Sequence, residues 1–99
     1  MKQIAEKVRQ ISSELDDAQR YAEESLYRKA YGDSFGASRY KEMAQDELKH
    51  AGFVHDMAVQ EIAKVENVYK APADMQEQWE KSQSDYVQRA ALVKQMLAM

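Results

Sequence analysis

Apolar residues recur every three or four positions along the first third of the chain, which is the spacing of one face of an α-helix. The alternation of three- and four-residue steps is typical of the seam between packed helices. We therefore predict a first helix over residues 2–31. Its apolar stripe consists of Ile4, Val8, Ile11, Leu15, Ala18 and Ala22.

A second helix is predicted over residues 35–70, and Pro72 ends it because the residue before a proline disfavours helical geometry. Between the two helices, Gly32 can take the left-handed conformation that terminates a helix. Asp33 or Ser34 could then cap the next one. The apolar face of this second helix is formed by Tyr40, Ala44, Ala51, Val54, Ala58, Ile62, Val65 and Tyr69.

A third helix is predicted over residues 73–98. Its apolar positions are Met75, Trp79, Tyr86, Ala90, Val93 and Leu97. The short first connection makes the first two helices antiparallel neighbours. Residues 1–99 are thus expected to form one all-α domain, a two-helix hairpin plus a C-terminal helix. This arrangement leaves apolar surface uncovered, so we expect a homodimer or larger homo-oligomer in which dimerisation completes a four-helix bundle.

The composition narrows the classes of function. The chain has no cysteine, which excludes disulfides and thiolate metal sites and fits a cytoplasmic location. Its net charge of −3, without a basic cluster, argues against a nucleic-acid partner. No apolar run approaches the ~20 residues needed to span a membrane, so we expect no membrane partner either.

Glu47 is the residue that points to chemistry, because it falls on the apolar face of the second predicted helix. Burying an unpaired carboxylate is unfavourable, so it needs a cation or a strong hydrogen-bond donor. His50 follows one turn later, and Glu and His at positions i and i+3 can share one metal ion. This donor pair suits iron, manganese or zinc. The alternative is an ion pair between Glu47 and an arginine or lysine across the bundle.

The first helix offers two carboxylates that could complete such a site. If the turn centres near Ser34, Glu24 lies ten residues before it and Glu47 thirteen after it, which places both at a similar height. Glu23 lies closer to the aliphatic stripe, so periodicity favours Glu23, whereas the aromatic surroundings favour Glu24. The tyrosines around Glu24 are Tyr21, Tyr27 and Tyr31.

The pattern of Glu24, Tyr31 seven residues later, and Glu47-Leu48-Lys49-His50 resembles the ferritin-like di-iron superfamily. The run DELKHAGFV is similar to the Glu-x-x-His-Ala helix of rubrerythrins and bacterioferritins. Many members carry two such hairpins in one chain, and this chain has one. Its architecture resembles the encapsulated ferritin-like proteins, whose metal site forms between subunits.

The resemblance implies a di-iron site made by Glu24, Glu47 and His50 from each of two chains. The implied function is ferroxidase activity, the oxidation of Fe(II) by oxygen or peroxide for iron storage or detoxification. Glu47 would bridge or chelate the metal, Glu24 would complete the carboxylate cage, and His50 would be a terminal ligand. A nearby tyrosine could hydrogen-bond a ligand or donate an electron, the candidates being Tyr27 and Tyr31.

Two other functions remain open from the sequence. One is a helical oligomerisation or interaction protein without chemistry, such as a small phage or accessory protein. The other is an assembly that a metal stabilises at the same residues without turnover. Neither alternative requires oxidation of a bound metal ion, so iron uptake and oxidation would separate the three.

Overall fold

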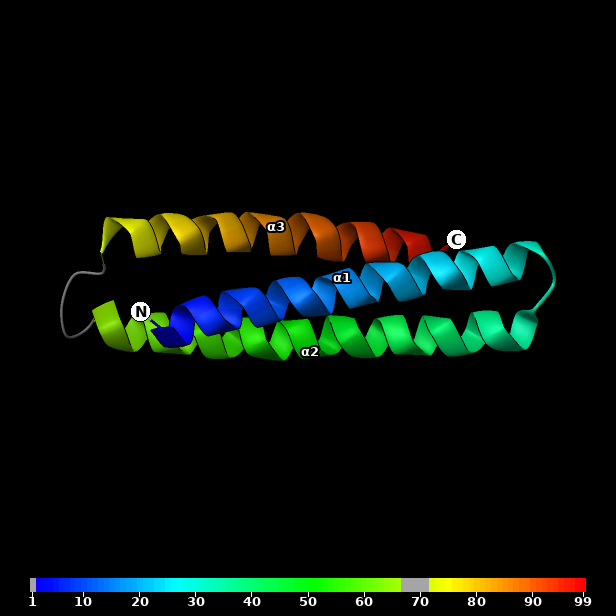
Figure 1. The fold of residues 1–99 in the computed structure, drawn as a ribbon, viewed down its shortest axis with the longest axis horizontal. Coiled ribbons are helices and arrows are strands. Elements are labelled where there is room, and N and C mark those ends of the chain that lie inside the picture. The colour runs from blue at the N-terminus through cyan, green and yellow to red at the C-terminus, as the bar shows by residue number, and fades with distance from the viewer. Residues whose placement is uncertain (1, 67–71) are drawn as a thin grey trace.

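The computed structural model describes residues 2–66 and 72–99, and the regular structure within them is entirely α-helical. Figure 1 shows a slender bundle, 56 × 18 × 17 Å, in which α1 and α2 form an antiparallel hairpin and α3 runs beside α1. The predicted all-helical fold with three helices is confirmed, while predicted positions 67–70 of the second helix lie outside the described residues. The helices span Lys2–Ala30 (α1), Ser34–Glu66 (α2) and Ala73–Leu97 (α3).

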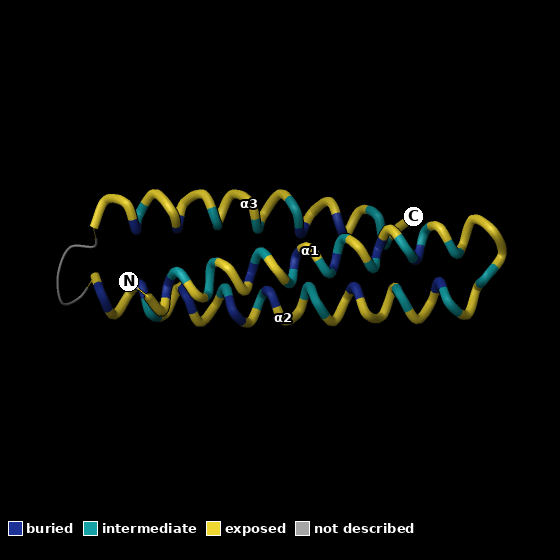
Figure 2. Tube along the Cα trace, viewed as in Figure 1, coloured by how far each residue is buried: buried dark blue, intermediate teal, exposed yellow. Residues whose placement is uncertain are grey.

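Within the described residues, most positions of the predicted apolar stripes are buried. Figure 2 shows buried segments recurring along the inner sides of the helices. In α1, Ile4, Leu15 and Ala22 are fully buried, and Val8 is partly buried against the same core. The outward sides of the helices are largely exposed and polar, and no helix in the described ranges is long and apolar enough to cross a membrane. The structure therefore follows the amphipathic pattern that the sequence carries.

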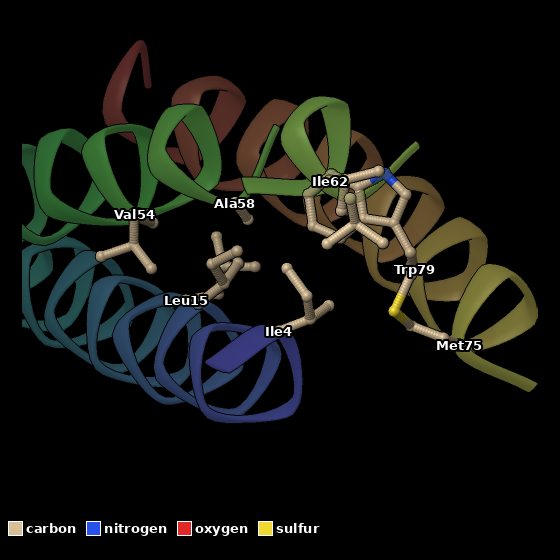
Figure 3. Close-up of a cluster of buried hydrophobic side chains, with 10 residues drawn as sticks. Ile4, Leu15, Val54, Ala58, Ile62, Met75 and Trp79 are labelled. Carbon is tan, nitrogen blue, oxygen red and sulfur yellow. The ribbon is translucent and has the colours of Figure 1, made fainter. Parts of the chain in front are cut away.

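All three helices contribute to the larger core cluster, which lies toward the end of the bundle away from the α1–α2 turn (Figure 3). Leu15 of α1, Ile62 of α2 and Trp79 of α3 are among its large side chains. Nearer the turn lies a smaller buried cluster, in which most of the side chains are alanines. Small side chains let helix axes approach closely. The smaller cluster consists of Ala18, Ala22, Ala44 and Val93.

The turn between α1 and α2 is built by a glycine and a capping aspartate. Gly32 has a φ of 90°, a conformation that other residues rarely adopt. Asp33 is the N-cap of α2, since its Oδ1 accepts a hydrogen bond from the backbone N–H of Gly36 at 2.9 Å. Arg28 donates to the other oxygen of Asp33 at 2.8 Å. These two contacts, the Gly36 bond first, lower the pKa of the Asp33 carboxyl.

Contacts with α3 are shared unequally between the two hairpin helices, and α1 makes most of them. Val93 packs against the alanines of the hairpin, and Arg89 forms an ion pair with Asp16 of α1. On α2, the ring of His55 stacks on two rings of α3. Its centroid lies 4.6 Å from that of Tyr86 and 5.3 Å from that of Trp79. A few side chains therefore fix α3 along one side of the hairpin.

Replacing Leu15 by alanine is expected to lower the free energy of unfolding by about 2–5 kcal/mol, because the side chain is fully buried and the helices around it cannot close the cavity. Urea denaturation followed by the helical circular dichroism signal measures the change. Leu92→Ala is the matched control, since Leu92 is 43% exposed, and it should change stability by less than ~0.5 kcal/mol. Equal losses in both variants would contradict this core.

Candidate metal site

Glu47 lies where α2 faces α1, as its place on the apolar stripe predicts. It stands between two fully buried alanines, Ala44 and Ala51, on adjacent turns of α2. Its side chain is 23% exposed, so the carboxylate is largely withdrawn from water. His50 lies within reach of this carboxylate, with 4.0 Å between Oε1 of Glu47 and Nδ1 of His50, and no described arginine or lysine forms an ion pair with Glu47.

The structure brings Glu14 of α1 to the same point. One ligand atom from each of Glu14, Glu47 and His50 lies within 4.8 Å of the others, a grouping that could hold a metal ion. Glu14 and Glu47 are half-buried between the helices, and His50 is exposed at the edge. We call this group the Glu14–Glu47–His50 cluster.

The cluster has excess negative charge. The pKa of the Glu47 carboxyl is raised, first because burial disfavours its charged form and further by the charges of Asp17, Glu14 and Asp46, while His50 opposes the shift. The Oε2 atom of Glu14 is buried, and no described residue donates a hydrogen bond to it. An acceptor of this kind is unfavourable in a folded protein unless something supplies a positive charge or a donor.

A divalent metal ion would supply that charge. Two carboxylates with one imidazole are a donor set suited to iron, manganese or zinc, and the ligand atoms are close enough to converge on one ion. Three protein ligands leave coordination positions open for water, substrate or a second set of protein ligands. The residues present thus fit a metal site that is open on one side.

Glu24 lies elsewhere on α1. Its carboxylate accepts a hydrogen bond from Nε of Arg28 at 2.8 Å, close to the turn. Neighbouring Tyr21 contacts Tyr40, which is seven residues, or about 10.5 Å, from Glu47 along α2. Within one chain Glu24 is therefore not part of the cluster, and its role as a ligand shared with a second chain stays a prediction. The rival carboxylate, Glu23, is exposed and accepts a hydrogen bond from Gln19 at 3.2 Å.

Four of the tyrosines form two pairs in the half of the hairpin nearer the turn. Tyr27 and Tyr31, the predicted candidates for a redox or hydrogen-bonding role, are 64% and 58% exposed near the turn, with ring centroids 4.9 Å apart. Tyr21 and Tyr40 are half-buried, and their centroids lie 6.1 Å apart. Tyr21 follows Glu14 by seven residues, which places both on one face of α1. Of the two pairs, Tyr21 and Tyr40 lie closer to the cluster.

Sequence reasoning missed Glu14, although a signal for it exists. Tyr21 follows Glu14 by seven residues, the same spacing as that of Tyr31 after Glu24. Glu14 also lies 33 residues before Glu47, an interval ten residues longer than that from Glu24. The longer interval accommodates the turn, and the same motif therefore fits Glu14 better.

No protein-family model, curated protein or solved structure matches the chain. Function is therefore inferred from the chemistry and geometry of the cluster itself. The groups on which this inference depends are the carboxylates of Glu14 and Glu47 and the imidazole of His50.

Replacing Glu47 by glutamine is expected to stabilise the metal-free protein at neutral pH by roughly 0.5–1 kcal/mol, the scale of a partly exposed charge interaction. A raised folded-state pKa means that the folded chain binds the proton more tightly than the unfolded chain. Stability therefore falls as pH rises from the unfolded value, about 4.3, through the raised folded value. The gain of Glu47→Gln should vanish below that window in urea denaturation at several pH values.

The matched control is Glu80→Gln, which removes an exposed carboxylate from α3. It should leave the pH dependence of unfolding unchanged. A Glu47→Gln variant that loses stability at pH 7 would instead show that the ionised Glu47 is stabilised by the folded chain.

Proposed function

We propose that this protein binds iron through the Glu14–Glu47–His50 cluster and acts as a ferroxidase of the ferritin-like type. In this proposal two chains meet at the open side of the cluster, so that each contributes Glu14, Glu47 and His50 to a di-iron centre. The dimer then has the four hairpin helices of a ferritin-like bundle. Iron held there would be oxidised by oxygen or peroxide, for storage or detoxification.

The observation that supports the proposal is the convergence of two half-buried carboxylates and an imidazole with no described lysine or arginine to neutralise Glu47. Like charges held together in a partly buried site are unfavourable unless a cation is present. Two such sets, one from each chain, supply the four carboxylates and two histidines of a di-iron carboxylate site.

Each side chain has a distinct part in this proposal. Glu47, which lies between two fully buried alanines on α2, would chelate or bridge the metal, and Glu14 would complete the carboxylate cage from α1. His50 would be a terminal ligand through one ring nitrogen. Tyr21 follows Glu14 by seven residues, the spacing that the ferritin-like motif has between its first glutamate and its tyrosine. Tyr21 would therefore donate a hydrogen bond or an electron. Iron supplies the one-electron chemistry, and the chain positions it.

The second candidate is a helical interaction protein without chemistry. It is favoured by the large apolar side chains that the described helices expose, among them Phe35 at 72% and Phe53 at 57%. Exposed apolar side chains often mark contacts with another protein where they gather into a patch. This candidate predicts association without iron uptake. It also predicts a Glu47→Gln variant that associates as well as the unchanged chain.

Anaerobic Fe(II) titration of the metal-stripped chain, with its mass in solution measured in parallel, tests the proposal. We expect about one iron per chain in a dimer or larger assembly, followed by oxidation when air enters. Glu47→Ala should abolish binding yet keep the helices, and Glu14→Gln should weaken it by at least roughly tenfold. The circular dichroism spectrum of each variant checks its helical content.

Glu24→Gln is the decisive companion variant. If Glu14 is the ligand from α1, Glu24→Gln retains iron binding, because its carboxylate serves Arg28 instead. Loss of iron in Glu24→Gln with retention in Glu14→Gln would reverse the assignment. Iron retained at full stoichiometry by Glu47→Ala would refute the site.

A further inference from the structure

A hollow opens between the hairpin and the C-terminal end of α3, close to the α1–α2 turn. Its volume is about 460 Å³, and a second hollow of about 420 Å³ adjoins it on the α2 side. Lys41, Leu97 and Ala98 line both hollows, which therefore form one continuous depression. Each volume is that of a small-molecule site. We call the two hollows together the α2–α3 groove.

The α2–α3 groove exists because α3 packs mainly on α1 and contacts α2 much less. In Figure 1, α3 also ends before the bundle reaches the α1–α2 turn. The buried cluster at this end consists mostly of alanines, whose side chains are too short to fill the space between α2 and α3. Larger apolar side chains of the lining are only partly buried and face this space. They are Leu26, Leu48, Met96 and Leu97.

The charged residues of the lining are all lysines. Lys29 and Lys41 line the first hollow, and Lys41 and Lys94 line the second. No described aspartate or glutamate lines either hollow. The chain as a whole has 17 acidic and 14 basic residues, so this concentration of positive charge runs against its overall balance. The groove is therefore complementary in charge to an anion.

Two of the three lysines have no counter-ion in the described part of the chain. The Nζ atom of Lys29 donates a hydrogen bond to the backbone oxygen of Met99 at 2.6 Å, which links α1 to the end of α3 and closes one end of the groove. Lys41 and Lys94 form no ion pair with a described carboxylate. Their ammonium groups are therefore available to an anion in the groove.

Hydroxyl groups accompany Lys41 on α2. Ser34 and Ser38 line the first hollow, and both are exposed. Ser34, Ser38 and Lys41 follow one another at steps of four and three residues, which places them on one face of the helix. An ammonium group with neighbouring hydroxyl donors is suited to the oxygens of a carboxylate or phosphate.

We infer that the α2–α3 groove binds an anionic amphiphile, a small molecule with one alkyl chain and a carboxylate or phosphate head. The head pairs with Lys41 and Lys94, and the alkyl chain covers the apolar lining around Leu97. An inorganic anion would leave that lining in water, which is unfavourable. A neutral apolar molecule would place hydrocarbon beside the two ammonium groups without supplying a counter-ion. An amphiphile with an anionic head satisfies both parts of the groove.

This groove is separate from the Glu14–Glu47–His50 cluster. Leu48 lines the groove, and His50 follows it by two residues, so the two side chains are turned by roughly 160° from each other around α2. Binding of an amphiphile therefore requires no iron. A chain that binds no Fe(II) would refute the proposed ferroxidase function and leave this inference standing.

Isothermal titration calorimetry of the metal-stripped chain with decanoate and with decyl phosphate, each below its micelle-forming concentration, tests the inference. We expect saturable binding of one molecule per chain, and the tighter of the two probes identifies the preferred head. Hexanoate should bind at least roughly tenfold more weakly than decanoate, because its shorter chain buries less apolar surface. The double variant Lys41→Gln, Lys94→Gln should bind decanoate at least roughly tenfold more weakly, because it loses two charged hydrogen-bond donors.

Lys64→Gln is the matched control, since Lys64 is exposed on α2 and lines neither hollow, and it should change the affinity by less than roughly twofold. Both replaced lysines of the groove are exposed, so the double variant is expected to fold, and its circular dichroism spectrum checks this. Undiminished affinity in the double variant would overturn the site. The same holds if neutral decyl maltoside binds as tightly as decanoate, or if neither anionic probe shows saturable binding.

Discussion

The register between α1 and α2 decides which side chains meet across the hairpin, and the turn sets that register. Gly32 reverses the chain, Asp33 caps α2, and the Ser25 hydroxyl donates to the carbonyl of Ala37 at 2.7 Å just inside the turn. Adding one residue to α1 before the turn would rotate its faces by about 100°. Glu14 would then leave Glu47, and the alanine contacts that hold the two helices together would be lost.

The helices and most of their buried positions follow from the sequence alone. Burying a stripe such as Ile4, Ile11 and Leu15 requires the chain to be helical, so a local periodicity is enough to predict both the element and its inner face. The turn is equally local, because residues other than glycine rarely adopt the φ of 90° found at Gly32. The burial of Ser25 does not follow from the sequence pattern. Its hydroxyl can be buried because it donates a hydrogen bond to a backbone carbonyl of the other helix, and such a contact depends on how the helices meet.

The sequence alone predicts only the part of the site that lies on a single helix. Glu47 and His50 share one helix, so their spacing reveals them, whereas the partner from α1 depends on where the turn is centred. Contacts such as Ser25 with Ala37 place that centre at residue 31, not near Ser34. An error of three residues doubles across a hairpin into a height difference of about 9 Å. A difference of about 9 Å is about six residues, so the residue of α1 that lies level with Glu47 moves from near position 21 to near position 15, next to Glu14 and away from Glu24.

All three members of the cluster belong to the continuous hairpin, and α3 contributes none of them. Attachment of α3 depends on a limited set of contacts, including the His55 stack and the Arg89–Asp16 ion pair, in addition to its share of the core. Elements with few contacts open locally at a lower free energy than the whole fold. Of the three helices, α3 is therefore the one expected to open first, and its opening would leave Glu14, Glu47 and His50 in place on the hairpin, so the contacts that fasten α3 are separate from those that position the cluster.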